Sequence, residues 1–208
     1  MMVNVNTLIF LARGLGTTIL IAFSTIVLSF VFGSVLGILR FSSKGLPGKL
    51  ATLYVDVIRN IPLLLFIIGF RFTLPLPPLA SAVAAMTVFT TAMVAEIIRG
   101  GLAAIPAGQW EAAYSQGFSF IGTMLYVILP QALKKMIRPL MGQFVTTIKD
   151  TSFCQIIAVK ELMYSGMIVM GKFVSSVQII MMYIGIAIVY YIVNILVLKI
   201  SEIITRRR

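Results

Sequence analysis

The sequence predicts an all-α integral membrane protein with five transmembrane helices, an N-terminus outside the cell and a C-terminus in the cytoplasm. Hydrophobic residues make up 60% of the 208 positions and charged residues only 11%, whereas about 25% of the residues of a soluble domain are charged. The segment from Leu15 to Leu39 has no charged residue and exceeds the roughly 20 apolar residues that cross a bilayer as a helix. The chain therefore needs lipid around it, and we expect a multi-pass protein of the cell membrane.

Each span follows from an apolar run and the residues that flank it. The first, at residues 15–39, is too long for the core of a secretory signal peptide, so we expect it to be retained. The second is expected at residues 50–74, although Asp56, Arg59 and Arg71 interrupt its apolar pattern; Pro75, Pro77 and Pro78 then form a short turn. Further spans are expected at residues 79–98, 139–159 and 178–198, with a long polar loop at residues 99–138. These elements form one membrane domain over residues 1–208.

The Lys and Arg residues predict the orientation of the domain. With the N-terminus outside, twelve basic residues fall on the cytoplasmic side: Arg40, Lys44, Lys49, Arg59, Arg99, Lys134, Lys135, Arg138, Lys199, Arg206, Arg207 and Arg208. Four fall outside: Arg13, Arg71, Lys160 and Lys172. Because basic residues are enriched in cytoplasmic loops, the loop at residues 99–138 is expected in the cytoplasm.

The composition argues against several kinds of site. The chain has no His and one Cys, so His-based metal centres, His-based catalytic triads and disulfides are not expected. Cys154 is expected to fill space in a helix. No Gly-x-x-x-x-Gly-Lys-Ser/Thr phosphate loop occurs, so any ATP must bind to a partner, and this chain is expected to lack cofactors and catalytic residues. The net charge of +11 is explained by topology rather than by nucleic acid.

The predicted cytoplasmic loop contains the pattern of a short helix. Pro106 suits a helix start, and Gly117 suits a helix end. Between them Trp110, Ala113 and Tyr114 recur at helical spacing. Two interpretations remain open: an amphipathic helix on the bilayer surface, or a docking element for a cytoplasmic partner.

The residues of this loop resemble the EAA loop of permease subunits of ABC importers. That pattern is Glu-Ala-Ala, three residues, Gly, nine residues and Ile-x-Leu-Pro. The chain has Glu111-Ala112-Ala113, Gly117 and Val127-Ile128-Leu129-Pro130, and departs from the pattern at Val127. Five stretches are similar to the branch that takes up polar amino acids: residues 54–64, 96–101, 105–109, 129–132 and 149–152. The chain departs from this branch at Met93, Gln116 and Gln143.

The resemblance implies a type I ABC importer permease fold and translocation of a polar or charged amino acid into the cytoplasm by alternating access. It implies as partners an ATP-binding cassette ATPase dimer, an extracellular or periplasmic solute-binding protein and a second permease subunit, identical or homologous. The ATPase would bind the ATP. Coupling to the ATPase is implied for Gln109, Glu111, Ala112, Ala113, Gly117, Leu129 and Pro130.

Two neighbouring charges fall at the centre of the fourth expected span. An ionisable residue there costs at least ~2.5–3.5 kcal/mol and normally faces protein or a water-filled cavity. Lys149 and Asp150 either pair with neighbouring helices or contact the substrate. In the second case Asp150 would accept from the ammonium of an amino acid, and Lys149, or backbone N–H groups at a helix break, would donate to its carboxylate. Thr151 and Ser152 add hydrogen-bonding capacity, and Met93 is expected near the translocation path.

A second pair of charges lies at the inner end of the third expected span. Glu96 and Arg99 are three residues apart, so they are expected to pair with each other, with a role in the inner gate as the alternative. For the whole chain, the alternative to a transporter subunit is a passive channel or a membrane scaffold. Neither of these needs a docking loop combined with central charges.

Overall fold

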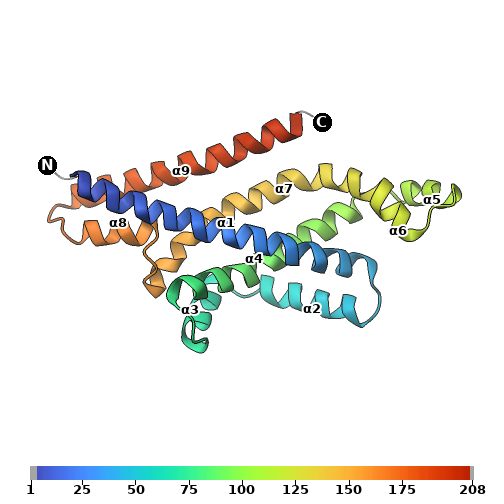
Figure 1. The fold of residues 1–208 in the computed structure, drawn as a ribbon, viewed down its shortest axis with the longest axis horizontal. Coiled ribbons are helices and arrows are strands. Elements are labelled where there is room, and N and C mark those ends of the chain that lie inside the picture. The colour runs from blue at the N-terminus through green and yellow to red at the C-terminus, as the bar shows by residue number, and fades with distance from the viewer. Residues whose placement is uncertain (1–3, 207–208) are drawn as a thin grey trace.

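The structure, a computed structural model, describes residues 4–206 as a bundle of helices (Figure 1). In chain order the helices are α1 (Val5–Ser42), α2 (Leu46–Arg59), α3 (Leu63–Thr73), α4 (Pro78–Ala103), α5 (Ala107–Ser115), α6 (Phe120–Gly122), the π-helix η1 (Thr123–Ile128), α7 (Leu129–Asp150), the 3₁₀-helix η2 (Thr151–Ile157), α8 (Leu162–Met170) and α9 (Ser176–Arg206).

Among the described residues, 4 helical segments are long and apolar enough to cross a membrane, and the count becomes 5 if the bent pair α2 and α3 forms one span. The four are Val5–Ser42, Pro78–Ala103, Phe120–Ile157 and Ser176–Ile200. The predicted all-helical membrane class is therefore confirmed.

The second expected span is not one continuous helix. α2 and α3 meet at an angle of 101°, and the break lies at Asn60 and Ile61. Pro62 follows, and because it lacks an N–H group and restricts the residue before it, it ends the helix on its N-terminal side. The amide of Asn60 donates to the backbone oxygen of Asp56 over 2.6 Å and closes the last turn of α2. The expected span at residues 50–74 thus consists of two helices that meet at a sharp bend.

The expected loop at residues 99–138 is mostly helical. α4 continues to Ala103, and one helical run begins at Phe120 and continues to Ile157 without interruption through α6, η1, α7 and η2. Only α5 and its flanking turns lie between them. The charges of Lys134, Lys135 and Arg138 depress the hydropathy of this segment, but all three are exposed on a helix that continues past them. Hydropathy indicates which surroundings a segment suits; it does not indicate where a helix ends.

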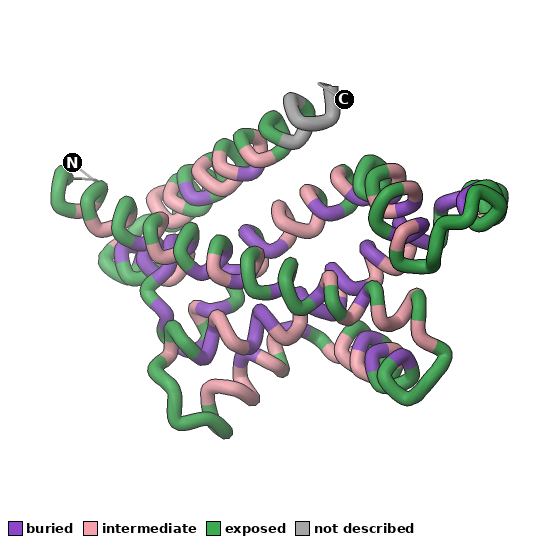
Figure 2. The backbone as a smooth tube through the Cα atoms, turned by 45° about the vertical axis from the view of Figure 1, so that its right-hand side comes forward, coloured by how far each residue is buried: buried purple, intermediate pink, exposed green. Residues whose placement is uncertain are grey.

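The long helices α1 and α4 pack closely along much of their length (Figures 1 and 2). The buried face of α1 is made mainly of small residues: Gly14, Thr18, Ile21, Ala22, Thr25, Ser29, Gly33 and Gly37. A Cβ atom at Gly33 would lie 2.7 Å from Cγ1 of Val94, and one at Gly37 would lie 2.6 Å from the backbone oxygen of Ala95. Small residues allow helix backbones to approach this closely in membranes.

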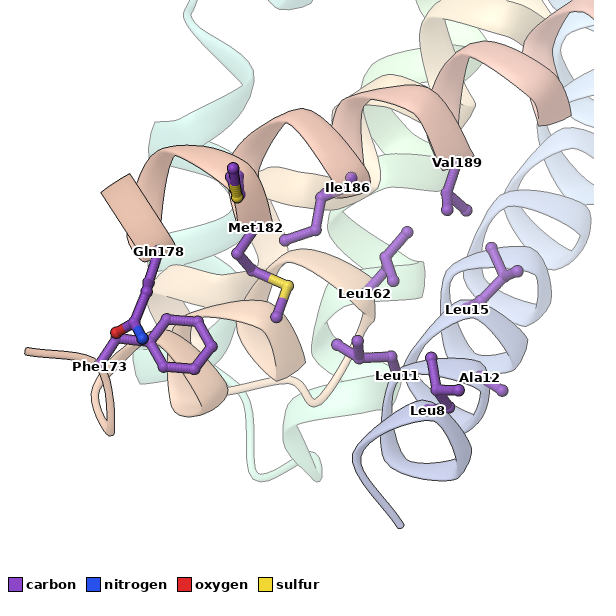
Figure 3. Close-up of a pocket in the computed structure, with 12 residues that line it drawn as sticks. Leu8, Leu11, Ala12, Leu15, Leu162, Phe173, Gln178, Met182, Ile186 and Val189 are labelled. Atoms are coloured by element: carbon purple, nitrogen blue, oxygen red, sulfur yellow. The ribbon is translucent and has the colours of Figure 1, made fainter. Parts of the chain in front are cut away.

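The helices α8 and α9 form a more open end of the bundle. α8 packs against α1 where a Cβ at Gly14 would meet Oγ of Ser165 at 2.5 Å. α9 packs on α8 through Ile186, whose side chain occupies the space beside Gly166. An apolar cavity lies between the N-terminal parts of α1 and α9, with Leu162 at its base (Figure 3).

The close packing of α1 on α4 gives a test of the fold. We expect Gly37→Ala to lower the unfolding free energy by about 1–3 kcal/mol, because the new methyl group overlaps the backbone of α4. Gly16→Ala is the matched control, since a Cβ at Gly16 has no heavy atom within 4 Å. The measurement is thermal unfolding of the purified protein in detergent. Equal melting temperatures for the two variants would contradict this packing.

Candidate coupling helix and charged sites

The short helix α5 has a defined start and end. It follows Pro106 and ends at Ser115. Gly117 has φ of 82°, and its N–H donates to the oxygen of Tyr114 over 2.9 Å, while the N–H of Phe118 donates to the oxygen of Ala113 over 3.1 Å. These two bonds form a Schellman motif, in which glycine takes the left-handed position without steric cost. The predicted helix over this segment, and its end at Gly117, are confirmed.

One face of α5 is fixed to the membrane helices. Trp110 stacks on Phe41 of α1 at 5.9 Å between ring centroids and on Phe120 of α6 at 6.0 Å. Ala113 is buried. Trp110 packs on an apolar cluster whose buried members come from α4, η1, α7 and the turn after α4: Val94, Ile98, Leu102, Ile105, Met124, Ile128, Ala132, Met136 and Leu140. Any force on α5 therefore reaches α4 and α7 through side chains in contact.

The other face of α5 is open. Gln109, Glu111 and Ala112 are exposed. Within residues 4–206, the carboxylate of Glu111 takes part in no ion pair. Oε1 of Gln109 accepts from Nε2 of Gln131 over 3.0 Å, which joins α5 to α7. The arrangement leaves a small, solvated surface whose position is set by the buried face beneath it.

The π-helix η1 carries the end of the EAA-like pattern. The N–H of Leu129 donates to the oxygen of Met124, five residues earlier. Pro130 follows and has no N–H to donate, so the regular α-helical bonding pattern is interrupted at this position. Single π turns of this kind insert one extra residue into a helix. Leu129 is half-buried and Pro130 exposed, and both lie at the start of α7, which contacts η1.

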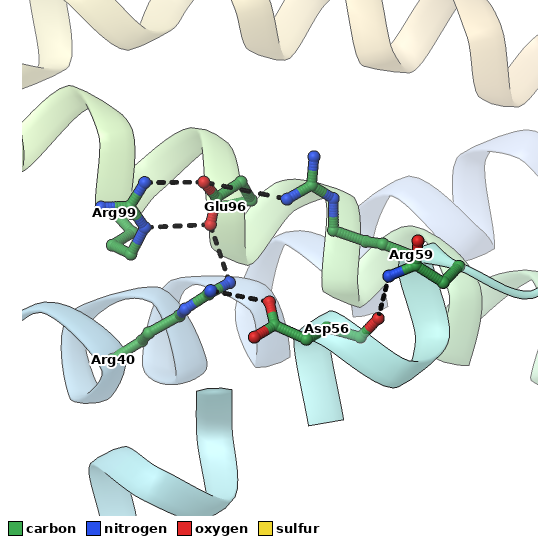
Figure 4. Close-up of polar contacts among 6 residues, drawn as sticks. Arg40, Asp56, Arg59, Glu96 and Arg99 are labelled. Atoms are coloured by element: carbon green, nitrogen blue, oxygen red, sulfur yellow. Dashed lines mark hydrogen bonds and ion pairs between the residues drawn. The ribbon is translucent and has the colours of Figure 1, made fainter. Parts of the chain in front are cut away.

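The C-terminal parts of α1, α2 and α4 meet in a network of ion pairs (Figure 4). Arg99 binds Glu96 in a bidentate manner, with Nε 2.9 Å from Oε2 and Nη2 2.7 Å from Oε1, as expected from the spacing of the two residues. Arg40 of α1 reaches the same carboxylate over 2.8 Å and binds Asp56 of α2 over 2.7 Å. Arg59 lies 3.8 Å from Oε1 of Glu96.

Sequence analysis missed most of this network. It placed Arg40 and Arg59 only as cytoplasmic charges and Asp56 only as an interruption of a span. The five charged residues of the network come from three helices, and spacing along the chain does not reveal which helices become neighbours. The one contact that spacing did reveal, between Glu96 and Arg99, is local.

Lys149, Asp150, Thr151 and Ser152 lie where α7 tightens into the 3₁₀-helix η2. Thr151 is buried and donates to the oxygen of Ile148 over 2.8 Å. Lys149 is exposed and Asp150 is half-buried. In the part of the chain that the structure describes, no ion pair involves Lys149 or Asp150. An ion pair between either residue and another helix of the same chain, which was one of the two expectations, is not found in that part of the chain.

The remaining expected site residue lies apart from this junction. Met93 is half-buried on α4, one helical turn before Glu96. No hydrogen bond or ion pair among the described residues joins the Lys149–Ser152 segment to Met93, Glu96 or α5. The helix α7 nevertheless links the two regions, because it starts near α5 and ends at η2, where the segment 149–152 lies.

Glu161 is a buried carboxylate that sequence analysis did not single out. It caps α8 by accepting from the N–H groups of Met163 and Tyr164 over 2.8 and 2.6 Å, and it also accepts from the hydroxyl of Tyr190 over 3.0 Å. Burial raises the pKa of this carboxyl group, while these donors act in the opposite direction. An acidic residue just before an apolar run is a recognisable start of a helix, so the capping role of Glu161 could have been predicted from the sequence. Its contact with Tyr190 of α9 could not.

The arrangement as a whole defines a class: a multi-pass membrane protein of the cell membrane that carries an exposed helix beside its bundle. The sequence model of the family described as "Binding-protein-dependent transport system inner membrane component" matches residues 29–208. The chain therefore belongs to this family, whose members are transport components.

Curated relatives cover most of the chain. It is 39% identical over 192 residues to the probable glutamine ABC transporter permease protein GlnP of Bacillus subtilis (90% of this chain, 88% of that protein). It is 38% identical over 190 residues to the L-cystine transport system permease protein TcyB of the same organism (87% and 80%). It is 32% identical over 170 residues to the glutamate/aspartate import permease protein GltK of Escherichia coli O157:H7 (76% and 76%).

Solved structures share the whole fold. A chain from the crystal structure of an amino acid ABC transporter with histidines superposes with a TM-score of 0.87 at 27% identity, covering 100% of both chains. A chain of the inward-facing MetNI methionine ABC transporter superposes with a TM-score of 0.83 at 19% identity, covering 99% of both. The bundle is thus the type I ABC importer permease fold.

The ion network gives a second test. Glu96→Gln should lower the unfolding free energy by about 1–3 kcal/mol, because three guanidinium groups lose their shared carboxylate. Asp56→Asn is the matched control: the side chain of Asp56 is 53% exposed, against 24% for Glu96, so its loss should cost no more than about 1 kcal/mol. Thermal unfolding in detergent measures both, and a larger loss for Asp56→Asn would contradict the central place of Glu96.

Proposed function

We propose that this chain is the permease subunit of an ATP-binding-cassette importer that moves a polar or charged amino acid into the cytoplasm. The observation that carries the proposal is α5, a short helix with an exposed face at Glu111 and Ala112 and a buried face fixed to α4 and α7. Membership of the transport family supports it, and so do relatives named for glutamine, cystine and glutamate/aspartate transport.

In the proposed topology the chain is one membrane domain over residues 1–208 with five spans, the N-terminus outside and the C-terminus inside. The second span is the bent pair α2 and α3. The twelve-to-four distribution of basic residues supports this orientation. It places α5 and the ion network on the cytoplasmic side, and α8 with its flanking loops on the outer side.

Coupling to ATP hydrolysis would run through the exposed face of α5. We assign docking of the ATPase dimer to Gln109, Glu111 and Ala112, positioning of the helix to Ala113 and Gly117, and connection to α7 to Leu129 and Pro130. The chain itself would not hydrolyse ATP. A second permease, identical or homologous, would complete the pathway, and an extracellular or periplasmic binding protein would deliver the amino acid. Alternating access follows if ATP binding draws the coupling helices of the two permeases together.

The substrate would meet the junction of α7 and η2. Asp150 would accept from the ammonium group of the amino acid, and Lys149 would donate to its carboxylate, because neither is neutralised within the described chain. Thr151, Ser152 and Met93 would complete the wall of the path. Glu96 and Arg99 would hold the inner gate closed through the ion network and release it when the inner helix ends separate.

Coupling is tested by Ala112→Trp. A large side chain on the exposed face of α5 should block the ATPase and reduce ATP-driven amino-acid uptake at least tenfold in proteoliposomes containing the complete importer. Ala80→Trp is the control, because Ala80 is also exposed but lies at the opposite end of α4 from α5. Full uptake by Ala112→Trp would refute the docking role, and uptake by the wild type without ATP would favour a passive channel instead.

The substrate contact is tested by Asp150→Asn. A charge-assisted hydrogen bond is worth about 1.5–3 kcal/mol, so the apparent affinity for a zwitterionic amino acid should fall about 10- to 100-fold while the subunits still assemble. Glu202→Gln, an exposed carboxylate in the last helix, should leave uptake unchanged. Concentration-dependent uptake of radiolabelled amino acid measures both, and unchanged kinetics for Asp150→Asn would make its role structural.

A further inference from the structure

An apolar cleft of 520 Å³ opens between the N-terminal parts of α1 and α9 (Figure 3). On α1 the cleft is lined by Leu8 and Leu15, and on α9 by Met182 and Val189. Leu162, at the start of α8, forms its base. Gln178 carries the one polar side chain of the lining, and it lies at the end nearest the start of α9.

A polar cavity adjoins the apolar cleft at that end. It shares Phe173 and Gln178 with the cleft and is otherwise lined largely by polar groups, including Asn4, Thr7, Lys172 and Ser175. Within the described chain Lys172 takes part in no ion pair. Because the cavity lies at the first turn of α1 and at the start of α9, the positive ends of two helix dipoles add to the charge of Lys172.

We propose that the two cavities together bind one anionic phospholipid, with an acyl chain in the apolar cleft and the headgroup beside Lys172. The two cavities form one continuous site that is apolar at one end and cationic at the other, which is the complement of such a lipid. The inference depends on the membrane location of the chain and not on the proposed amino-acid transport.

The dimensions of the cleft agree with this ligand. Gln178 and Val189 are separated by about 16 Å along α9 at 1.5 Å per residue, and one leaflet of the hydrocarbon core is about 15 Å thick. The length of the cleft thus matches the thickness of one leaflet. A volume of 520 Å³ holds only about one turn of an α-helix with its side chains, so a chain-like ligand fits it better than a helix of a partner.

The test uses the complete importer, purified in detergent and titrated with phosphatidylglycerol or phosphatidylcholine under native mass spectrometry. We expect one phosphatidylglycerol per chain, bound more tightly than phosphatidylcholine. Gly185→Leu should weaken this binding more than tenfold, because Gly185 lines the cleft and a Cβ there has open space around it, so the new side chain can occupy the cleft. Gly16→Leu, at an equally open glycine of α1 outside the cleft, should bind as the wild type does.

The headgroup is tested separately. Lys172→Gln should weaken phosphatidylglycerol binding about fivefold and leave phosphatidylcholine unchanged. Lipid binding that survives Gly185→Leu, or equal binding of the two lipids to the wild type, would overturn the proposal. So would efficient crosslinking of Gly185→Cys to a second permease subunit, since the cleft would then be a protein interface. If Gly185→Leu does not assemble, Ala12→Leu on the opposite wall provides the same test.

Discussion

The close approach of α1 and α4 is the constraint on which the rest of the structure depends. In lipid no hydrophobic force drives two apolar helices together, so they associate through dispersion contacts and polar groups that reach across the interface. The glycines at positions 33 and 37 bring the backbone of α1 against Val94 and Ala95 of α4. That contact brings the end of α1 level with Glu96, and Arg40 then reaches its carboxylate. The contact of Arg40 with Glu96 therefore depends on the close packing of α1 on α4.

The helical run from Phe120 to Ile157 joins the surroundings of α5 to the segment at Lys149–Ser152. One end packs beneath α5 through Met124 and Ile128, and the other carries Lys149 and Asp150. The run departs from α-helical geometry only near these two ends, as a π turn at η1 and a 3₁₀ segment at η2. Such local departures are common at functional sites and hinges. After η2, Ala158 has φ of 59°, which a residue with a Cβ adopts at a steric cost, and the chain there reverses direction toward α8.

The all-helical membrane class and the short helix α5 were predictable from sequence because both rest on local patterns. Apolar runs predicted the long helices, and Pro106 and Gly117 predicted the limits of α5. The bend at Asn60–Pro62 was missed because the apolar run continues through it, although Pro62 was visible in the sequence. The contacts of Arg40, Asp56 and Glu161 were not predictable, because each depends on which helices become neighbours. The first part of α7 was expected to be a loop because it carries several charged side chains. Such side chains indicate exposure to water, but they do not end a helix.

α4 takes part both in the apolar cluster beneath α5 and in the ion network, and these contacts give the proposed coupling a physical route. Its C-terminal half contributes Ile98 and Leu102 to the apolar cluster beneath α5 and Glu96 to the ion network with α1 and α2. At Gly101 the side chain of Met136 fills the space where a Cβ would be, at 2.3 Å, so α7 cannot slide freely past α4. Packed interiors are dense and transmit displacement rather than absorb it. If α5 couples to a partner as proposed, its displacement would reach through this cluster the segment of α4 that carries Glu96.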